Sequence, residues 1–440
     1  MNSNEYFNEL AQTVIGADEV ADLAAPLRAA LPEAEPYELF ARICWSGLCE
    51  PGDRAAGALV EALGAGAIYP LLLAQTDHVR KLILDVPELS DIDWTAAMQR
   101  WQPRLRLERF TAACRHAAQL AARVLIPGDA QWPRQFGDLG HSAPHALWVR
   151  GQVEALTKTG KSVALVGSRA ATPYGSQVTA DLAAGMADRG FVIVSGGAYG
   201  VDAMAHRSAL ASNAPTVAVL AGGVDRLYPA SNRGLFEHMM PDGAVVSELI
   251  VGQAPERWRF VQRNRLIAAL AQVTCVVEAG TRSGALHTAR NALELGRGVG
   301  AVPGPVTSAG SVGCHDLIRD LPVRLVTDAD DLFQLWQEQQ AFGWSETVPA
   351  TLDLEWGSPV SHAPGNSRHA AAGNTAARPA RRRSDGAVRI LDALRPRARR
   401  SPEQLAEHAG MSAAEVRAAL TELELSGDVV REIDGWRRTS

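Results

Sequence analysis

Lysine is nearly absent from this 440-residue chain. Lys81, Lys158 and Lys161 are the three lysines among 43 basic residues, and the others are arginines. Because 49 acidic residues outweigh the basic ones, the formal net charge is −6. That balance excludes a protein that coats nucleic acid through bulk positive charge, although it leaves local basic sites open. The codon bias of a GC-rich genome would also produce an arginine excess, so arginine abundance alone indicates no site.

The sequence also shows no cysteine pair at metal-site spacing, no long apolar segment and no secretory-signal pattern in its first residues. Its 5 cysteines form no C-x-x-C pair, which argues against a disulfide framework and a zinc cluster. The longest apolar stretch, residues 59–74, contains Glu61 and Pro70 and is shorter than the ~20 residues that a membrane span needs. The first residues have neither the basic start nor the apolar run of a secretory signal. We therefore expect a cytoplasmic protein without a metal site or membrane association.

Shifts in composition divide the chain into four segments. Residues 1–122 show helical periodicity, and the first hundred residues carry sixteen acidic against six basic side chains, which disfavours this segment as a primary grip on DNA. Residues 123–340 alternate short strands with helices. Residues 341–386 lose all periodicity and are rich in Pro, Gly, Ser, Ala and Arg, as expected of a flexible linker. Residues 387–440 form a separate unit, and residues 368–400 carry ten basic against two acidic side chains.

The central segment predicts an α/β fold with a doubly wound sheet. Near-continuous β-branched runs, each followed by a glycine-rich turn and a helical stretch, are typical of parallel strands covered on both faces. Right-handed crossovers place the loops at the strand ends along one edge, where such sheets bind ligands. The predicted strands are residues 162–166, 191–194, 216–220, 244–246 and 273–277.

Glycine-rich loops follow these strands and indicate an anion site at that edge. Glycine lets the backbone approach a ligand, and the N-terminus of the following helix offers unpaired N–H donors. Several such loops at successive strand ends favour a phosphate-bearing ligand, although tight turns alone would also need glycine. The sequence Gly167–Thr172 does not fit G-x-G-x-x-G, so the dinucleotide fingerprint fails. The loops contain Gly167-Ser168-Arg169, Ser195–Gly200, Ala221–Gly223, Ser247-Glu248, Glu278–Gly284 and Pro303–Pro305.

Arginine and aromatic side chains lie among these loops. Arg169 directly follows the first strand of the set, and Arg263-Asn264-Arg265 lies in a later helix. Guanidinium groups match phosphate oxygens in two-point contacts, and interleaved aromatic rings can stack on unpaired bases. The alternative is structural: these arginines could pair with Asp202, Glu248 or Glu278. The aromatic candidates are Tyr199, Tyr228 and Phe260.

The C-terminal segment predicts a winged helix. Ser401–Gln404 and Ser412–Glu415 are capping boxes that start two helices after a first helix at residues 387–394. Asp434-Gly435, between two short β-rich runs, predicts a hairpin turn. The third helix, residues 412–426, is the candidate for major-groove contact but carries few base-reading side chains. DNA reading and protein docking both stay open for this unit.

The central motifs closely resemble the DNA processing protein A (DprA/Smf) family. The resemblance is dense over residues 125–335, and the helical front and the winged-helix tail agree with the layout of that family. It identifies the fold as an extended Rossmann-like core with an N-terminal helical, SAM-like domain and a C-terminal winged helix. The matching blocks are Gly167–Arg169, Ser195–His206, Ala221–Pro229, Arg263–Ala268, Val277–Ala279, Ser283–Ala285, Thr288–Arg290 and Ala301–Gly304.

The resemblance implies a non-catalytic protein without a cofactor. Members of this family bind and protect single-stranded DNA, form homodimers and load the RecA recombinase during natural transformation and recombination. Arg169 and the backbone of Gly167-Ser168 correspond to the phosphate grip, while Arg263 and Arg265 shape the pocket or add a contact. Tyr199 stands where relatives usually have lysine or arginine. The expected DNA-binding residues are Gly167, Ser168, Arg169, Ser195, Gly196, Gly197, Tyr199, Gly200, Arg263, Asn264, Arg265, Ser283 and Gly284.

The alternative is a nucleotide-processing hydrolase of the lysine-decarboxylase-like Rossmann group. Such enzymes carry P-G-G-x-G-T-x-x-E, whose glutamate is the catalytic carboxylate. In this chain Gly280-Thr281-Arg282-Ser283 leads to Gly284 instead. Without a carboxylate there, general acid–base help worth ~10²–10⁴-fold has no obvious source. Asp202, Glu248 and Glu278 could still form an acidic set in the crevice.

Overall fold

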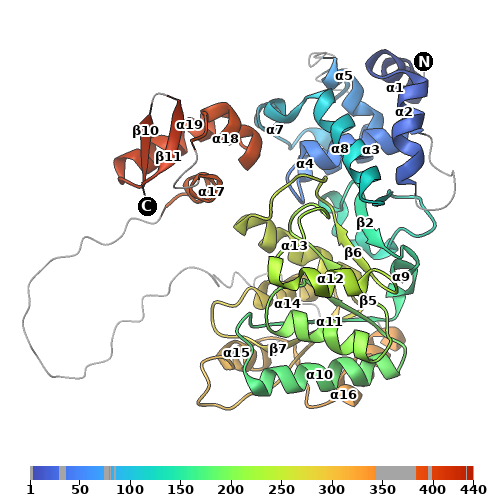
Figure 1. Ribbon diagram of the computed structural model, residues 1–440, viewed down its shortest axis with the longest axis vertical. Helices are drawn as coiled ribbons and strands as arrows, with labels where there is room; N and C mark the ends of the chain where they lie inside the picture. The colour runs from blue at the N-terminus through green and yellow to red at the C-terminus, as the bar shows by residue number, and fades with distance from the viewer. Residues whose placement is uncertain are drawn as a thin grey trace, which may run out of the picture.

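The computed structural model describes residues 3–28, 36–73, 79, 81–83, 86–342, 383–394, 399–432 and 434–439. Figure 1 shows an N-terminal group of helices above a sheet with helices on both faces, and a small C-terminal unit beside them. Most of the segment predicted to be a linker, residues 341–386, lies outside the described residues. The last core helix continues to Phe342, and the first helix of the C-terminal unit begins at Asp385.

The N-terminal unit is helical, as its periodicity predicts. Asp53 caps one of these helices, because its carboxylate accepts hydrogen bonds from the N–H groups of Ala55 and Ala56 at 3.1 and 3.3 Å. The α-helices of this unit are α1 (Ser3–Val14), α2 (Ala17–Ala24), α3 (Pro36–Leu48), α4 (Arg54–Leu63), α5 (Ile68–Leu72), α7 (Trp94–Trp101) and α8 (Leu107–Gln119).

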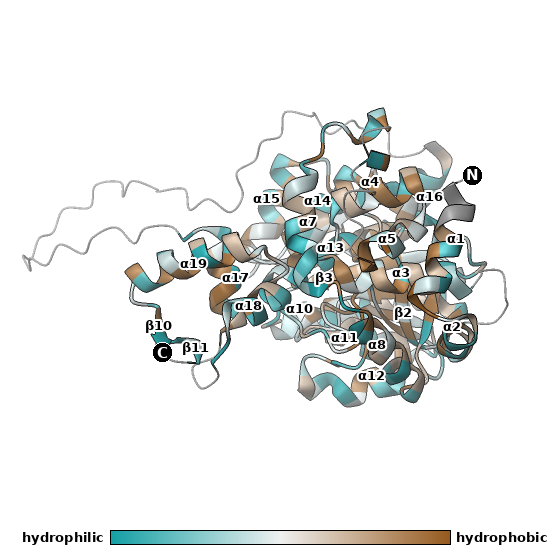
Figure 2. Ribbon diagram, turned by 90° about the horizontal axis from the view of Figure 1, so that it is seen from above, coloured by the Kyte–Doolittle hydropathy of each residue, from teal (hydrophilic) through white to brown (hydrophobic). Residues whose placement is uncertain are grey.

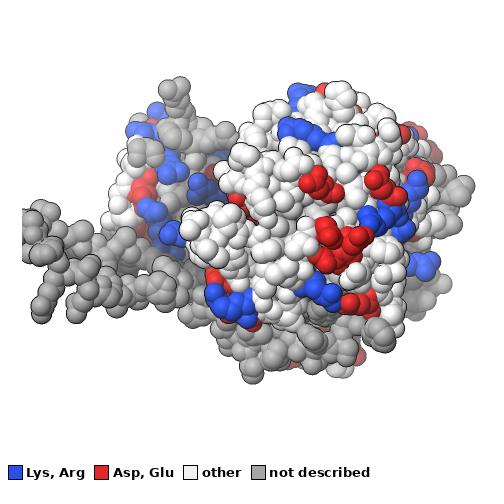
Figure 3. Space-filling model, turned by 90° about the horizontal axis from the view of Figure 1, so that it is seen from below, with Lys and Arg blue, Asp and Glu red and all other residues white. Residues whose placement is uncertain are grey.

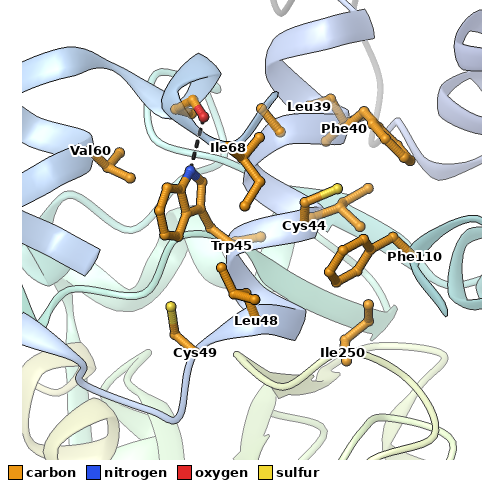
Figure 4. Packing of buried hydrophobic residues seen from close by; sticks show 14 of the residues in the cluster. Leu39, Phe40, Cys44, Trp45, Leu48, Cys49, Val60, Ile68, Phe110 and Ile250 are labelled. Carbon is orange, nitrogen blue, oxygen red and sulfur yellow. Dashed lines mark hydrogen bonds between the residues drawn. The ribbon is translucent and has the colours of Figure 1, made fainter. Parts of the chain in front are cut away.

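One hydrophobic core joins this unit to the sheet. Figure 4 shows Trp45 at its centre, where the indole N–H donates to the carbonyl of Ala65 at 2.9 Å. Phe110 of α8 packs there together with Ile250, which belongs to the loop after the sixth strand, and Trp148 of the second strand is in the same cluster. Figure 2 shows apolar residues concentrated where α3, α5 and the strand β2 (Leu147–Gly151) come together. The helical front is therefore packed onto the sheet.

The central sheet has nine strands in the order β1-β2-β6-β5-β4-β3-β7-β8-β9 among the described residues. The five predicted strands are confirmed as β3 to β7. Strands β3 to β9 run parallel, whereas β2 pairs antiparallel with β6 and β1 with β2. The bounds are β1 (Arg123–Leu125), β2 (Leu147–Gly151), β3 (Ser162–Gly167), β4 (Val192–Ser195), β5 (Thr216–Val219), β6 (Ala244–Ser247), β7 (Val273–Glu278), β8 (Gly298–Ala301) and β9 (Arg324–Leu325).

Helices cover both faces of this sheet, as the Rossmann-like prediction requires. Val163 and Leu165 of β3 pack on one face with α10, α11 and α16, while Ala164 and Val166 pack on the other with α13, α14 and α15. This alternation follows from the two-residue period of a strand. The helices are α9 (Glu154–Thr157), α10 (Pro173–Asp188), α11 (Val201–Ala211), α12 (Arg233–Met239), α13 (Arg257–Leu270), α14 (Ala285–Glu294), α15 (Val312–Asp320) and α16 (Ala329–Phe342).

The C-terminal unit is the predicted winged helix. It contains α17 (Asp385–Ala393), α18 (Pro402–Ala409), α19 (Ala413–Leu425) and the hairpin β10 (Val429–Glu432) and β11 (Gly435–Arg438). Both predicted capping boxes form. The turn differs from the prediction, because Gly435 pairs with Glu432 inside the second strand. Glycine is required there, since a Cβ would lie 2.6 Å from the carbonyl oxygen of Arg400.

No single helix among the described residues is long and apolar enough to cross a membrane. The helices Arg54–Leu63 and Ala65–Leu72 are long and apolar enough only when taken together, and the chain bends by 116° between them.

Candidate functional site

The strand order creates a crevice at one edge of the sheet. From β3 the chain adds β4, β5 and β6 on one side and then returns to place β7 on the other side of β3. The loops after β3 and β7 therefore diverge, which is the position where doubly wound sheets bind ligands. A crevice of roughly 1070 Å³ lies there between residues 166–170 and 280–285, with α13 along one side.

Seven of the thirteen predicted site residues line this crevice. Asn264 of α13 donates its side-chain amide to the carbonyl of Gly284 at 3.2 Å and so ties the helix to the loop after β7. The seven residues are Gly167, Ser168, Arg169, Arg263, Asn264, Ser283 and Gly284.

The glycine loops are less open to an anion than the sequence suggests. The N–H of Ser168, expected in the phosphate grip, donates to the carbonyl of Glu278 at 2.7 Å. The carboxylate of Asp202, in the first turn of α11, accepts from the N–H groups of Gly196 and Ala198 at 3.1 and 3.4 Å. The chain's own acceptors thus occupy these three donors.

Ser195, Gly196, Gly197 and Gly200 do not line the crevice and pack against neighbouring segments instead. The hydroxyl of Ser195 is buried and donates to the carbonyl of Leu165 at 2.7 Å. A Cβ on the three glycines would come within 2.4 Å of Arg263, Phe236 and the backbone of Ser168, respectively. Glycine is therefore needed at these positions for close packing. From the sequence alone, this requirement cannot be distinguished from glycine that lets a ligand approach the backbone.

Arg263 lies at the floor of the crevice. Its side chain is buried, its Nη1 donates to the carbonyl of Val219 at 2.5 Å, and its Nε has no hydrogen-bond partner among the described residues. Burial lowers the pKa of Arg263 to about 10, against the opposing effect of Asp202. Burial raises the pKa of Asp202, whereas the positive charge of Arg263 and the hydrogen bonds from the N–H groups of Ala198 and Gly196 act to lower it. Arg263 thus holds a desolvated positive charge at the lining of the crevice.

Arg169 and two aromatic rings form the mouth of the crevice. The guanidinium carbon of the exposed Arg169 lies 5.1 Å from the centre of the Phe260 ring. The rings of Tyr228 and Phe260 lie 5.7 Å apart, and Tyr228 is 47% exposed. A cation over one ring and an exposed second ring offer a base both a charged and an aromatic surface.

Arg265 and Tyr199 lie outside the lining of the crevice. Arg265 forms a two-point ion pair with Glu248 at 2.6 Å and donates to the carbonyl of Ser142, so its role here is structural. Tyr199 is 47% exposed.

Two lining arginines were missed as site residues. Arg257 begins α13 and pairs with Asp392 of the winged helix at 3.7 Å, and Arg282 is exposed in the loop after β7. Arg282 follows β7 as Arg169 follows β3, so its position at a strand end was an available signal. No sequence signal brings Asp392 to the crevice, because it lies beyond the predicted linker.

The three carboxylates considered for catalysis all have structural partners. Glu248 pairs with Arg265, and Asp202 accepts from the loop that follows β4. Glu278 is 3% exposed and accepts from the N–H of Thr172 at 2.9 Å. No group of three or more His, Cys, Asp or Glu suited to a metal ion occurs in the described ranges.

Comparisons with known proteins agree with this architecture. A family model described as DNA recombination-mediator protein A matches residues 123–337, and a DprA winged helix domain model matches residues 374–435. The putative DNA processing protein DprA of Mycobacterium tuberculosis is 46% identical over 244 residues, which cover 53% of this chain and 62% of that relative. The match thus spans less than two thirds of that protein.

Two further relatives cover more of the chain. The protein Smf of Escherichia coli is 34% identical over 317 residues, which cover 71% of this chain and 77% of that protein. The X-ray structure of DNA processing protein A from Streptococcus pneumoniae aligns with a TM-score of 0.53 and 29% identity, over 67% of this chain and 95% of that one. This chain therefore belongs to the DNA processing protein A (DprA/Smf) family.

Proposed function

We propose that this protein binds single-stranded DNA in the crevice, as a DNA processing protein in transformation and recombination. The observation that carries the proposal is the mouth of the crevice, where Arg169 lies over Phe260 beside the exposed ring of Tyr228. The bases of a duplex already stack on one another, whereas those of a single strand are free to stack on such rings. Arg257, Arg263 and Arg282 supply further positive charge for the phosphates.

Figure 3 supports a local site over a general basic surface. On the face it shows, basic and acidic side chains of the core are interspersed. A strand therefore depends on positioned arginines, and its affinity should fall with salt in proportion to the few phosphates contacted.

The test is the variant Arg169→Ala, measured by fluorescence anisotropy with single and double strands over a range of salt. Loss of the cation should weaken single-strand binding by ~1–3 kcal/mol for all sequences alike and flatten the salt slope by about 0.7. Arg233→Ala is the matched control, because Arg233 is 72% exposed and pairs with Glu237 on α12, outside the crevice lining. Equal affinity of the wild type for both kinds of strand would contradict the proposal, as would unchanged binding by Arg169→Ala.

We also infer that the protein is not an enzyme. The alternative nucleotide hydrolase needs a carboxylate that is free to move a proton, whereas Asp202, Glu248 and Glu278 are committed to backbone N–H groups or to Arg265. Product analysis after incubation with nucleotides tests this inference, and turnover abolished by Glu278→Gln would contradict it.

Delivery of the strand to RecA and a homodimeric state are further proposals, supported by family membership. Sedimentation of the full chain tests the dimer. The rate of RecA assembly on a strand held by this protein tests the delivery.

A further inference from the structure

A second pocket, which we call the junction pocket, lies where the three units of the protein meet. It has a volume of roughly 550 Å³, and its lining includes Arg109, Arg226, Arg399, Arg400, Gln253 and Gln404. Arg109 comes from α8, Arg226 and Gln253 come from loops of the core, and the other three come from the winged helix. Each unit therefore contributes at least one cation to the same space.

Buried contacts fix the winged helix beside this pocket. Glu50 accepts from Arg104 at 2.5 Å and from Arg259 at 2.7 and 3.0 Å. The same two guanidinium groups donate to the carbonyl oxygens of Glu407 and His408 at the end of α18. Arg104 and Arg259 are 1% and 0% exposed, so the winged helix has a defined position over the pocket.

Arginine side chains gather at this junction together with the carboxylates of Glu50, Glu407 and Glu256. Arg104, Arg109 and Arg259 gather around Glu50 and Glu407. Arg109 Nη1 lies 3.6 Å from Glu407, which is too long for a hydrogen bond, and this buried atom has no hydrogen-bond partner among the described residues. Burial, with the positive charges of Arg104 and Arg259, lowers the pKa of Arg109 to about 10. A bound anion would supply the hydrogen-bond acceptor that Nη1 of Arg109 lacks.

Arg226 and Arg399, two further arginines of the pocket lining, are more than half exposed and take part in ion pairs. Arg226 is 57% exposed and pairs with Asp225 at 3.1 Å. Arg399 is 53% exposed and pairs with Glu432 and Asp434 of the wing. The Arg399–Asp434 pair is exposed on both sides and contributes little stability, so a phosphate can replace Asp434 at low cost. Asp225 is 6% exposed, so a phosphate at Arg226 would bind beside that carboxylate rather than replace it.

The junction pocket and the crevice share their bordering loops. Arg226 lines the pocket and Tyr228 lines the crevice, two residues apart on one loop. Along the loop before α13, residues 252–254 line the pocket, while residues 255 and 256 and Arg257, the first residue of α13, line the crevice. A strand that passes the ring of Tyr228 therefore leaves the crevice beside the junction pocket.

We propose that the junction pocket binds a backbone phosphate of the same strand that occupies the crevice. This inference rests on the proposed function and extends it, because the strand then contacts all three units and the docked winged helix becomes part of its path. A free phosphate ion offers the same chemistry, and the experiment separates the two sources.

The experiment measures binding of the full chain to single strands of about 5 and about 25 nucleotides, lengths chosen to fill the crevice alone or to extend beyond it. Arg226→Ala and Arg399→Ala should each weaken binding of the long strand by about fivefold and flatten its salt slope by about 0.7. Both should leave binding of the short strand within about twofold of the wild type. The matched control is again Arg233→Ala, which should change the binding of neither the long nor the short strand.

The outcomes separate this inference from the proposed function. If Arg169→Ala weakens short-strand binding while Arg226→Ala and Arg399→Ala leave long-strand binding unchanged, the crevice binds the strand and the junction proposal is overturned. If Arg169→Ala has no effect on the short strand, the proposed function fails first. Calorimetry with inorganic phosphate is the second arm. Phosphate binding that Arg226→Ala abolishes, without any loss of long-strand affinity, assigns the pocket to a free ion and also overturns the proposal.

Discussion

Replacement of Glu50 tests whether one buried carboxylate holds the three units together. The carboxylate of Glu50 accepts hydrogen bonds from the guanidinium groups of Arg104 and Arg259, and from the indole N–H of Trp258 at 2.9 Å. Glu50→Gln keeps the size of the side chain but removes its charge. The amide N–H₂ group of the glutamine then faces N–H groups that are themselves hydrogen-bond donors. Removing one partner of a buried ion pair costs about 3–5 kcal/mol, because the remaining charges stay buried without compensation. We expect a loss of unfolding free energy in that range.

Urea denaturation measures this loss, and hydrogen exchange locates it. The amides of α18 should exchange faster in Glu50→Gln, because Arg104 and Arg259 lose the carboxylate that orients them toward the α18 carbonyls. Glu19→Gln is the matched control: Glu19 pairs with Arg115 at 3.0 Å, both side chains are more than half exposed, and the expected loss is below ~1 kcal/mol. A loss in Glu50→Gln no larger than in this control would refute the reasoning.

The stability lost in Glu50→Gln should depend on pH, and the direction of this dependence follows from the pKa of Glu50. Burial alone would raise the pKa of Glu50, but Arg259 and Arg104 outweigh it and hold the pKa well below its usual range. A carboxylate with a lowered pKa stabilises the fold above its unfolded value of ~4.3, and this contribution is lost as the pH falls. The stability difference between wild type and Glu50→Gln should therefore be full at pH 7 and shrink below about pH 4.3.

Two further substitutions test the packing around the crevice and the core. Gly196→Ala should weaken single-strand binding and stability together, because its Cβ would lie 2.0 Å from Nη1 of Arg263; Gly234→Ala, with no atom within 4 Å of its Cβ, should be neutral in both assays. Trp45→Phe should lower the unfolding free energy by about 1–3 kcal/mol, measured in urea, because the buried carbonyl of Ala65 loses its indole donor. Unchanged stability of Trp45→Phe would mean that the carbonyl finds another donor.

Periodicity and capping predicted the fold of the core and of the winged helix well. The β3 to β7 runs are continuously apolar because both of their faces are buried, and that pattern is visible without coordinates. The antiparallel strands β1 and β2 were missed. Strand β1 has only three residues, and both strands join the sheet through pairing with distant segments, which a local pattern does not reveal.

The candidate site was predictable in position but less so in the role of each residue. The edge of the sheet follows from the strand order, and Arg169 and Arg263 do line the crevice. The hydrogen bonds of Ser168 and Asp202 were not predictable, because they depend on the exact distance between neighbouring loops. The junction pocket was also beyond sequence reasoning, because α8 and α18 meet only after the whole chain has folded.

The buried arginines change how the composition of this chain should be understood. Arg104, Arg259 and Arg263 are 5% exposed or less, and each donates to a backbone carbonyl of another segment. A lysine ammonium lacks the planar fork that reaches several acceptors at once, so these positions would not tolerate the exchange. Part of the arginine excess thus serves the internal packing of the protein and is buried from solvent. An alanine scan that treats every arginine as a contact to DNA will record failures of folding as failures of binding, unless the stability of each variant is measured alongside its affinity.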